Sequence, residues 1–184
     1  MMEQFVPKAM FFTKGVGKHR HNLQSFEAAL RHARIAEFNL VRVSSIFPPG
    51  CKIVSREEGL KRLQFGGVTH CVIAETRTDE PSRLVAAGIG LAVPADKTKF
   101  GYISEHHGFG ITEKRCSDLV EDMAATMLAT TQGIELDPEK AYDERREIYK
   151  AQRLIVRTRA IVQTAEGDKN GLWTTVVAAA VFCY

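Results

Sequence analysis

The chain has 184 residues, 45% of them hydrophobic, which is enough for one domain with a substantial core. The formal net charge of +3 is small, and the densest basic stretch, residues 145–159, is interleaved with Glu144 and Glu147. This mixture indicates a solvated helix face or strand and argues against a nucleic-acid-binding surface. The apolar run of residues 172–184 is too short to cross a bilayer, which takes roughly 20 residues, so no membrane partner is predicted.

The cysteines and histidines show no metal-binding pattern. The four cysteines lie far apart without a C-x-x-C spacing, and the six histidines lack the spacing of metal ligands. We therefore predict no metal site. Scattered cysteines in a chain without a secretory hydrophobic segment indicate a reducing compartment, and we expect the protein in the cytoplasm.

The beginning of the chain predicts a strand, a helix and a second strand. Residues 8–13 form the first strand candidate, and Gly15-Val16-Gly17 is expected to be the turn after it. Asn22 can cap a helix, and residues 38–44 form the next strand candidate. The apolar stripe of the helix is predicted to comprise Leu23, Phe26, Leu30 and Ala33.

The middle of the chain predicts three strands. Residues 69–75 and 84–93 are apolar or β-branched, and we expect them to pair across the turn at residues 79–81. Residues 99–106 add another strand.

A second amphipathic helix follows. It is predicted to begin at Thr112 and to end at Gly133, and residues 137–149 form a third, short helical candidate. The apolar face of the second helix is predicted to comprise Cys116, Leu119, Val120, Met123 and Met127.

Two long strands are predicted at the end of the chain. Residues 154–163 and 172–182 flank a clear turn at residues 166–171, which predicts a hairpin. Strands outnumber helices, and the last two are predicted to be hairpin-linked. The fold class that we predict is therefore a layered α+β sandwich rather than a doubly wound parallel sheet.

The most informative segment is the run of residues 39–50, in which a strand pattern enters a serine pair and stops at two prolines. A strand interior gains nothing from Ser44 and Ser45, and the Pro48-Pro49 pair denies the chain further ladder hydrogen bonds. The serines are therefore predicted at an abrupt strand end, where a side chain can be presented to a cleft. On these residues alone, a plain turn remains the simpler explanation.

Three sequence blocks occur in order between residues 11 and 49. They are F-F-T-K-G-V-G, L-x-S-F-E-x-A-L and N-L-V-x-V-S-S-I-x-P-P. Together they resemble the N-terminal signature of the pyruvoyl-dependent arginine decarboxylases, and residues 101–105 and 178–182 also resemble that family. The likeness spans nearly the whole chain. It implies a four-layer αββα sandwich formed by residues 1–184 as a single domain.

Decarboxylation of an amino acid leaves a carbanion that no ordinary side chain can delocalise, whereas a carbonyl that forms a Schiff base with the substrate can. No pyridoxal-phosphate arrangement is visible, because no glycine-rich phosphate cup accompanies an identifiable Schiff-base lysine. The resemblance implies that the carbonyl belongs to a pyruvoyl group made from Ser45. In that maturation the Ser45 hydroxyl attacks the carbonyl of Ser44, and elimination splits the chain into residues 1–44 and 45–184.

Two further residues are candidates for the chemistry. Glu105 is the candidate proton donor to the carbanion, a role that requires burial to keep its carboxyl protonated near neutral pH. Its neighbours Tyr102 and Ile103 fit a partly buried strand, although an exposed glutamate without a role is the alternative. The resemblance implies that Asn39 orients the reacting centre, although asparagine is also common at strand starts.

Substrate choice is predicted to depend on Glu27, which the resemblance aligns with an acidic residue of the family. A planar guanidinium makes two parallel hydrogen bonds to one carboxylate. The family residue can be aspartate, and the extra methylene of glutamate leaves lysine or a shorter basic amino acid open as the substrate. Leu30 and Ile46 are candidates for lining the same pocket, with a core position equally open for Leu30.

We therefore predict a self-processing, pyruvoyl-dependent decarboxylase that converts L-arginine to agmatine and CO2. One alternative is the same chemistry on another basic amino acid such as lysine, and another is a non-catalytic α+β domain that never cleaves. The resemblance also implies a homo-oligomer, a trimer or a multiple of trimers, with active sites between subunits.

Overall fold

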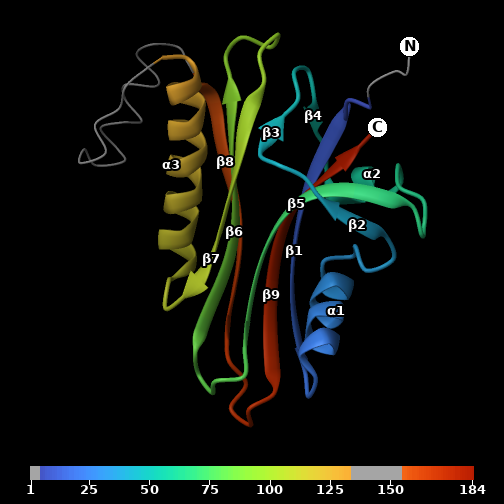
Figure 1. Cartoon of the computed structure of the whole chain (residues 1–184), viewed down its shortest axis with the longest axis vertical. Coiled ribbons are helices and arrows are strands. Elements are labelled where there is room, and N and C mark those ends of the chain that lie inside the picture. Colours follow the sequence, from blue (N-terminus) through green and yellow to red (C-terminus); the bar gives the residue numbers. More distant parts are fainter. Residues whose placement is uncertain (1–4, 134–154) are drawn as a thin grey trace.

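The computed structural model describes residues 5–133 and 155–184 (Figure 1). Its elements in chain order are β1 (Ala9–His19), α1 (Asn22–His32), β2 (Asn39–Arg42), β3 (Ile46–Phe47), β4 (Lys52–Ile53), α2 (Arg56–Leu60), β5 (Val68–Thr78), β6 (Leu84–Pro94), β7 (Gly101–Phe109), α3 (Glu113–Thr131), β8 (Ile155–Glu166) and β9 (Trp173–Cys183). The strands form two sheets, with the orders β2-β5-β9-β1-β4 and β3-β7-β6-β8.

Helices cover the outer faces of both sheets. Helices α1 and α2 pack on the five-stranded sheet, which we call the α1 sheet, and α3 packs on the four-stranded sheet, the α3 sheet (Figure 1). The inner faces of the two sheets enclose one apolar core. The predicted four-layer αββα sandwich is confirmed.

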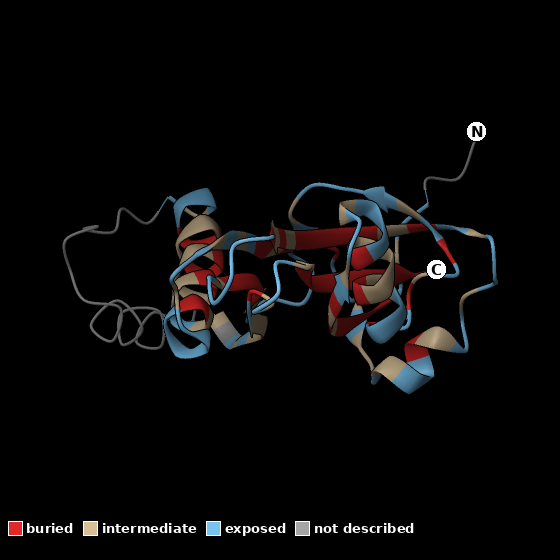
Figure 2. Ribbon diagram, turned by 90° about the horizontal axis from the view of Figure 1, so that it is seen from below, coloured by how far each residue is buried: buried red, intermediate tan, exposed pale blue. Residues whose placement is uncertain are grey.

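Strand β1 shows how the sequence builds these layers. Met10 and Phe12 point into the core between the sheets, whereas Ala9 and Phe11 point toward the helices. A strand that is covered on both faces needs apolar residues at successive positions, and this explains the continuous apolar run at the start of β1. Figure 2 shows buried residues throughout the sheets, with exposed residues on the outer faces of the helices.

The glycines expected to form a turn after β1 lie inside it instead. An added Cβ at Gly15 would overlap the carbonyl oxygen of Ala29, and one at Gly17 would overlap the carbonyl oxygen of Ser25. Both clashes are with the backbone of α1. The glycines therefore allow the helix to lie directly on the strand, a close approach that the sequence pattern of a turn does not reveal.

The same close approach changes the buried face of α1. The predicted apolar stripe is wrong at Leu23, which is 72% exposed, because small residues make the closest contact with the sheet. Ser25 and Ala29 are the buried residues of the helix, and the Ser25 hydroxyl lies 2.6 Å from Thr175 Oγ1. The predicted cap is wrong as well. Asn22 is the first helical residue, and its Oδ1 accepts a hydrogen bond from Arg77.

Both predicted strand pairs are wrong for a common reason. Strand β5 pairs with β2 and β9 in the α1 sheet, whereas β6 pairs with β7 and β8 in the α3 sheet. The turns at residues 79–83 and 167–172 therefore carry the chain from one sheet to the other, and β8 and β9 do not form a hairpin. The two turns lie side by side, because Ser82 N–H donates to Gly167 O (3.0 Å) and Gly167 N–H donates to Arg83 O (2.8 Å).

Helix α3 begins and ends as predicted. The Thr112 hydroxyl accepts a hydrogen bond from Arg115 N–H, and Gly133 follows the helix with a φ of 74°. Its buried face is built from Cys116, Val120, Ala124, Ala125, Leu128 and Ala129. The predicted face is thus right for two residues, while Leu119, Met123 and Met127 are only partly buried.

Two further expectations concern helices. The helical candidate at residues 137–149 lies outside the described residues. Among the helices that the structure describes, none combines the length and the apolar character needed to span a membrane.

Candidate active site

The serine pair lies where the chain leaves one sheet and enters the other. Val43 N–H donates to Cys71 O (3.0 Å), which extends the pairing of β2 with β5 by one residue. Ile46 then pairs with Tyr102 of β7 in the α3 sheet. Ser44 and Ser45 therefore occupy the crossing itself, and the predicted abrupt strand end is confirmed.

Backbone hydrogen bonds hold both serine carbonyls. Ile46 N–H donates to Ser44 O (3.1 Å), which closes a three-residue turn around Ser45. Ile103 N–H of β7 donates to Ser45 O (2.7 Å). Neither serine has a positive φ or a cis peptide bond. The crossing is thus fixed by hydrogen bonds and not by an unusual backbone angle.

Glu105 lies at the same edge of the α3 sheet as the serine crossing. It follows Ile103 by two residues on β7, so both side chains point to the inner face of the sheet, with Cα atoms about 6.7 Å apart. Ile103 is fully buried, but Glu105 is exposed. The strand is partly buried as expected, yet a single chain leaves the Glu105 carboxylate in solvent.

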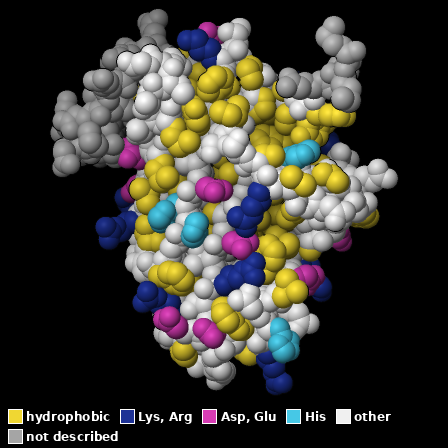
Figure 3. All heavy atoms as spheres, viewed as in Figure 1, with side chains coloured by type: hydrophobic (Ala, Val, Ile, Leu, Met, Phe, Trp, Pro, Cys, Tyr) yellow, Lys and Arg dark blue, Asp and Glu magenta, His cyan; other side chains and the backbone are white. Residues whose placement is uncertain are grey.

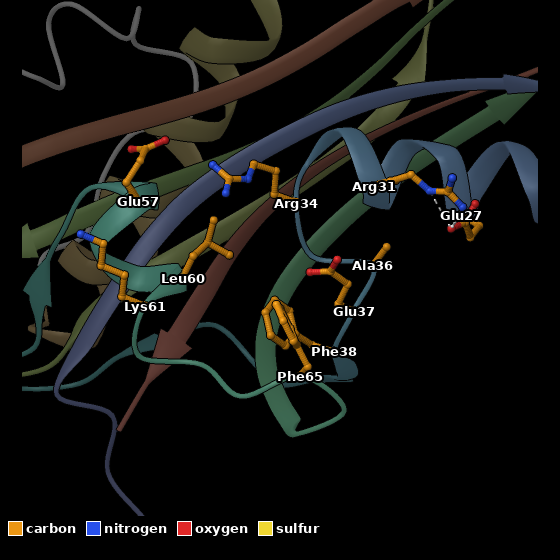
Figure 4. A pocket seen from close by; sticks show the side chains of 10 residues that line it. All are labelled: Glu27, Arg31, Arg34, Ala36, Glu37, Phe38, Glu57, Leu60, Lys61 and Phe65. Atoms are coloured by element: carbon orange, nitrogen blue, oxygen red, sulfur yellow. Dashed lines mark hydrogen bonds and ion pairs between the residues drawn. The ribbon is translucent and has the colours of Figure 1, made fainter.

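Glu27 lies away from the serine pair in a single chain. Its Oε1 accepts a hydrogen bond from Arg31 Nη2 (2.6 Å) on the next turn of α1. Figure 4 shows this pair at one side of a cavity of about 870 Å³ between α1, α2 and the loop before β5. The cavity is lined by Glu27, Arg31, Arg34, Ala36, Glu37, Phe38, Glu57, Leu60, Lys61 and Phe65.

The other predicted site residues are distributed over three places. Leu30 packs against the core between α1 and its sheet. Asn39 is exposed at the far end of β2 from the serines, and its side-chain amide donates to Gly66 O (2.6 Å). Ile46 is 39% exposed and lines a cavity of about 410 Å³ together with Ser44. One chain therefore brings together Ser44, Ser45, Ile46 and Glu105, but not Glu27 or Asn39.

Two ion pairs and one cation–π contact link β2 to α1 through β5. Arg42 Nη2 lies 3.0 Å from Glu75 Oε2, and Glu75 Oε1 lies 3.0 Å from Arg77 Nη2. Arg77 in turn stacks over the ring of Phe26 at 4.3 Å. Burial raises the pKa of the nearby Cys71 thiol to about 11, although Arg42 opposes the shift, so this thiol stays neutral. In Figure 3 no single charge sign dominates the visible face.

Comparisons with known proteins identify the family. Residues 9–184 match the family model described as pyruvoyl-dependent arginine decarboxylase. A probable pyruvoyl-dependent arginine decarboxylase of Chloroherpeton thalassium is 57% identical over 96% of this chain and 97% of that protein. Pyruvoyl-dependent arginine decarboxylase 2 of Methanosarcina acetivorans is 56% identical over the same shares. The chain belongs to the pyruvoyl-dependent arginine decarboxylase family.

Membership in the pyruvoyl-dependent arginine decarboxylase family confirms the resemblance drawn from the three sequence blocks and makes the chain a decarboxylase with a covalent pyruvoyl cofactor. The serine crossing fits that group. The Ser45 side chain is partly buried, and both flanking carbonyls are fixed by hydrogen bonds. Across residues 5–133 and 155–184, no three His, Cys, Asp or Glu side chains gather as they would to hold a metal ion.

One residue beside the serine crossing was not singled out from the sequence. His70 lines the cavity of about 410 Å³ beside Ser44, and its Nδ1 lies 2.7 Å from the Tyr184 hydroxyl. The sequence analysis gave His70 no role, because the six histidines lack the spacing of metal ligands. Only the pairing of His70 with Val41 brings it to the serine crossing, and that pairing joins strands far apart in the chain.

Proposed function

We propose that the chain is a self-processing enzyme that converts L-arginine to agmatine and CO2, using a pyruvoyl group made from Ser45. The observation that supports this most directly is the hydrogen bond from Ile46 N–H to Ser44 O. This oxygen belongs to the carbonyl that the Ser45 hydroxyl would attack. A backbone N–H already aimed at an oxygen that gains negative charge lowers the barrier to the attack.

Cleavage between Ser44 and Ser45 would leave both fragments in place. The fragment of residues 1–44 contains β1, which pairs with β9 over eleven residues in the middle of the α1 sheet. The fragment of residues 45–184 begins at the carbonyl that Ile103 N–H holds. We therefore expect the two fragments to remain associated, with residue 45 kept at the edge of β7.

The pyruvoyl carbonyl supplies the electron sink that decarboxylation requires. Glu105, at the same edge, is the proposed proton donor to the substrate carbon after CO2 leaves. A carboxyl group holds its proton near neutral pH only when burial disfavours the charged form. Because Glu105 is exposed in one chain, this role requires that a second chain cover it.

Recognition of arginine is proposed to involve residues that a second chain supplies. Glu27 would bind the guanidinium, Leu30 and Ile46 would contact the substrate, and Asn39 would orient the reacting centre. Within one chain, Glu27 and Asn39 lie apart from Ser45. Their separation supports a homo-oligomer, and we propose a trimer or a multiple of trimers in which neighbouring chains complete each site.

The names of these relatives favour arginine over lysine as the substrate, and their close similarity to this chain disfavours a non-catalytic domain. All four cysteines are free thiols, which supports the cytoplasm as the proposed location.

The decisive experiment compares two serines that lie at sheet crossings. We expect Ser45→Ala to remain one chain of full mass and to release no agmatine. Ser82→Ala, at the opposite crossing, should cleave and turn over as the wild type does. Intact-mass measurement and an agmatine assay check both variants. Normal cleavage of Ser45→Ala, or an active wild-type enzyme that is one continuous chain, would refute the proposal.

A second experiment tests the shared site. Ser45→Ala chains, which lack the cofactor but keep Glu27, are co-expressed with Glu27→Ala chains, which have the reverse defect. We expect mixed oligomers to recover activity that neither variant shows alone. Mixed oligomers that stay inactive, although both chains are present, would place the whole site within one chain.

A further inference from the structure

We propose that His70, held by Tyr184, is the acid–base residue of the self-cleavage between Ser44 and Ser45. The inference rests on the proposed self-processing and adds to it the group that moves the proton. It is carried by the cavity of about 410 Å³ that Ser44, His70 and Tyr184 line together.

Strand pairing places His70 under the serine crossing. In the parallel pairing of β2 with β5, Val41 lies opposite His70, and the next ladder bond joins Val43 N–H to Cys71 O. His70 alternates with Cys71 along β5 and therefore points toward the core between the sheets, at its rim. The chain leaves β2 directly above this rim to reach Ser44.

The cavity offers few other groups that could move a proton. Its lining consists of Phe5, Val6, Pro7, Val43, Ser44, Ile46, Pro48, Pro49, His70, Phe182 and Tyr184. Among these residues, His70 and Tyr184 are the two whose side chains carry a titratable group other than a serine hydroxyl. Apart from Ser44, the remaining lining residues are apolar and offer no side-chain group that could take up a proton.

Tyr184 orients the imidazole of His70. The Tyr184 hydroxyl lies 2.7 Å from His70 Nδ1, and its ring also packs edge-on against Phe5. When Nδ1–H donates to the hydroxyl oxygen, Nε2 keeps its lone pair and can accept a proton. Burial raises the pKa of Tyr184, so the phenol remains neutral and available as this partner.

The proposed step balances without any outside reagent. His70 Nε2 takes the proton of the Ser45 hydroxyl as Oγ bonds to the carbonyl carbon of Ser44, whose oxygen faces Ile46 N–H. When the peptide C–N bond breaks, the protonated ring returns that proton to the nitrogen of residue 45. The product is an ester between the two serines.

The rest of the maturation follows from the ester. Loss of the α-proton of residue 45 breaks its Cβ–Oγ bond, and the bonding pair leaves with the carboxylate of Ser44. The enamine left at residue 45 tautomerises to an imine, and water replaces ammonia to give the ketoacyl group.

The test follows the cleavage itself. Full-length protein is made by cell-free synthesis, synthesis is stopped, and the uncut fraction is followed by denaturing electrophoresis. We expect His70→Ala to cleave about 100-fold more slowly than the wild type, because general acid–base catalysis contributes at least that much. Added imidazole should raise the cleavage rate of His70→Ala about tenfold, since the cavity opens to solvent. Tyr184→Phe, which keeps the ring, should slow cleavage about tenfold.

The controls separate this inference from the proposed function. His19→Gln should cleave at the wild-type rate, because His19 is the last residue of β1 and pairs with Trp173, away from the serine crossing. Circular dichroism against uncut Ser45→Ala checks that each slow variant is folded. Wild-type cleavage rates in both the His70 and Tyr184 variants would overturn the inference, as would a folded, slow His70→Ala that imidazole leaves unchanged. A wild-type chain that stays uncut would instead overturn the proposed function.

Discussion

The chain passes between the two sheets at both ends of the sandwich, and the two ends are built differently. At the lower end in Figure 1, the turns at residues 79–83 and 167–172 hydrogen-bond to each other. In the upper half, residues 43–45 cross from β2 to β3, and residues 48–51 cross back to β4. The lower turns support each other, whereas the serine crossing is held by β7 and by its own three-residue turn.

This difference indicates that the two ends have different roles. A crossing that is hydrogen-bonded to a second crossing has its backbone groups satisfied within the fold. At the serine crossing, the hydrogen bonds instead fix the two carbonyl groups that flank the Ser45 side chain, beside a cavity. We propose that the lower end serves stability and that the upper end carries the peptide bond that breaks. The following predictions test that division.

The largest expected effect comes from a carboxylate at the reactive end. We expect Glu105→Gln to cleave normally but to lose about 100- to 10,000-fold in kcat, because the amide cannot donate the proton that a carboxyl group would supply. Intact mass reports cleavage, and agmatine release reports turnover. The matched control is Glu166→Gln, which alters a carboxylate at the lower end of the α3 sheet and should leave kcat unchanged. An unchanged kcat in Glu105→Gln would remove that residue from the mechanism.

A smaller effect is expected from the proposed recognition residue. Glu27→Ala should raise the KM for arginine about 30- to 5,000-fold, which corresponds to roughly 2–5 kcal/mol for a truncated buried ion pair. Cleavage of the chain should be unaffected. Glu58→Ala is the control, because Glu58 pairs with Arg62 four residues further along the chain, as Glu27 pairs with Arg31. Equal KM values in the two variants would refute the recognition role.

Helix α3 and the serine crossing could be predicted because both carry local signals, whereas the four layers were implied by the family resemblance. Helix α3 has its capping threonine and terminal glycine, and the serine pair is followed directly by Pro48 and Pro49. What the sequence did not reveal depends on contacts between distant segments. The role of Gly15 is set by the backbone of α1, and no local pattern indicates which sheet receives the strand after a turn.

The candidate site likewise contains residues that the sequence singled out and residues that only distant contacts place. Ser45 and Glu105 lie at one edge because β3 pairs with β7, and the family motif had already singled out both residues. His70 reaches the serine crossing only through the parallel pairing of β2 with β5. In the proposed oligomer, the place of Glu27 relative to Ser45 depends on a second chain, about which one sequence carries no geometric information.

The free energy of unfolding should also differ between the two ends, by a smaller effect than those on kcat and KM. We expect Gly167→Ala to lower the free energy of unfolding by about 3 kcal/mol, because the new Cβ would overlap Glu80 O of the neighbouring turn. Gly50→Ala, in the return crossing near the serines, should lower it by about 1 kcal/mol. No atom lies within 4 Å of that Cβ, and only the positive φ of 70° opposes it.

Urea unfolding checks both values in a Ser45→Ala background, in which a single uncut chain unfolds. Equal losses in the two variants would show that the lower turns are no more tightly packed than the serine crossing.

The smallest expected effect is electrostatic and belongs to the lower end. The Asn170 N–H and the Lys18 ammonium, at 3.3 Å, lower the pKa of the Asp168 carboxyl. A lowered folded-state pKa means that the stabilisation is complete above the unfolded value of roughly 3.9 and is lost as the pH falls through the folded-state pKa. Asp168→Asn should therefore unfold at a lower urea concentration than its parent at pH 6, and the gap should close toward pH 2. The gap should be small, since exposed ion pairs contribute little. A gap that is constant with pH would mean that Asp168 supports the lower turns by its shape and neutral hydrogen bonds, and not by its charge.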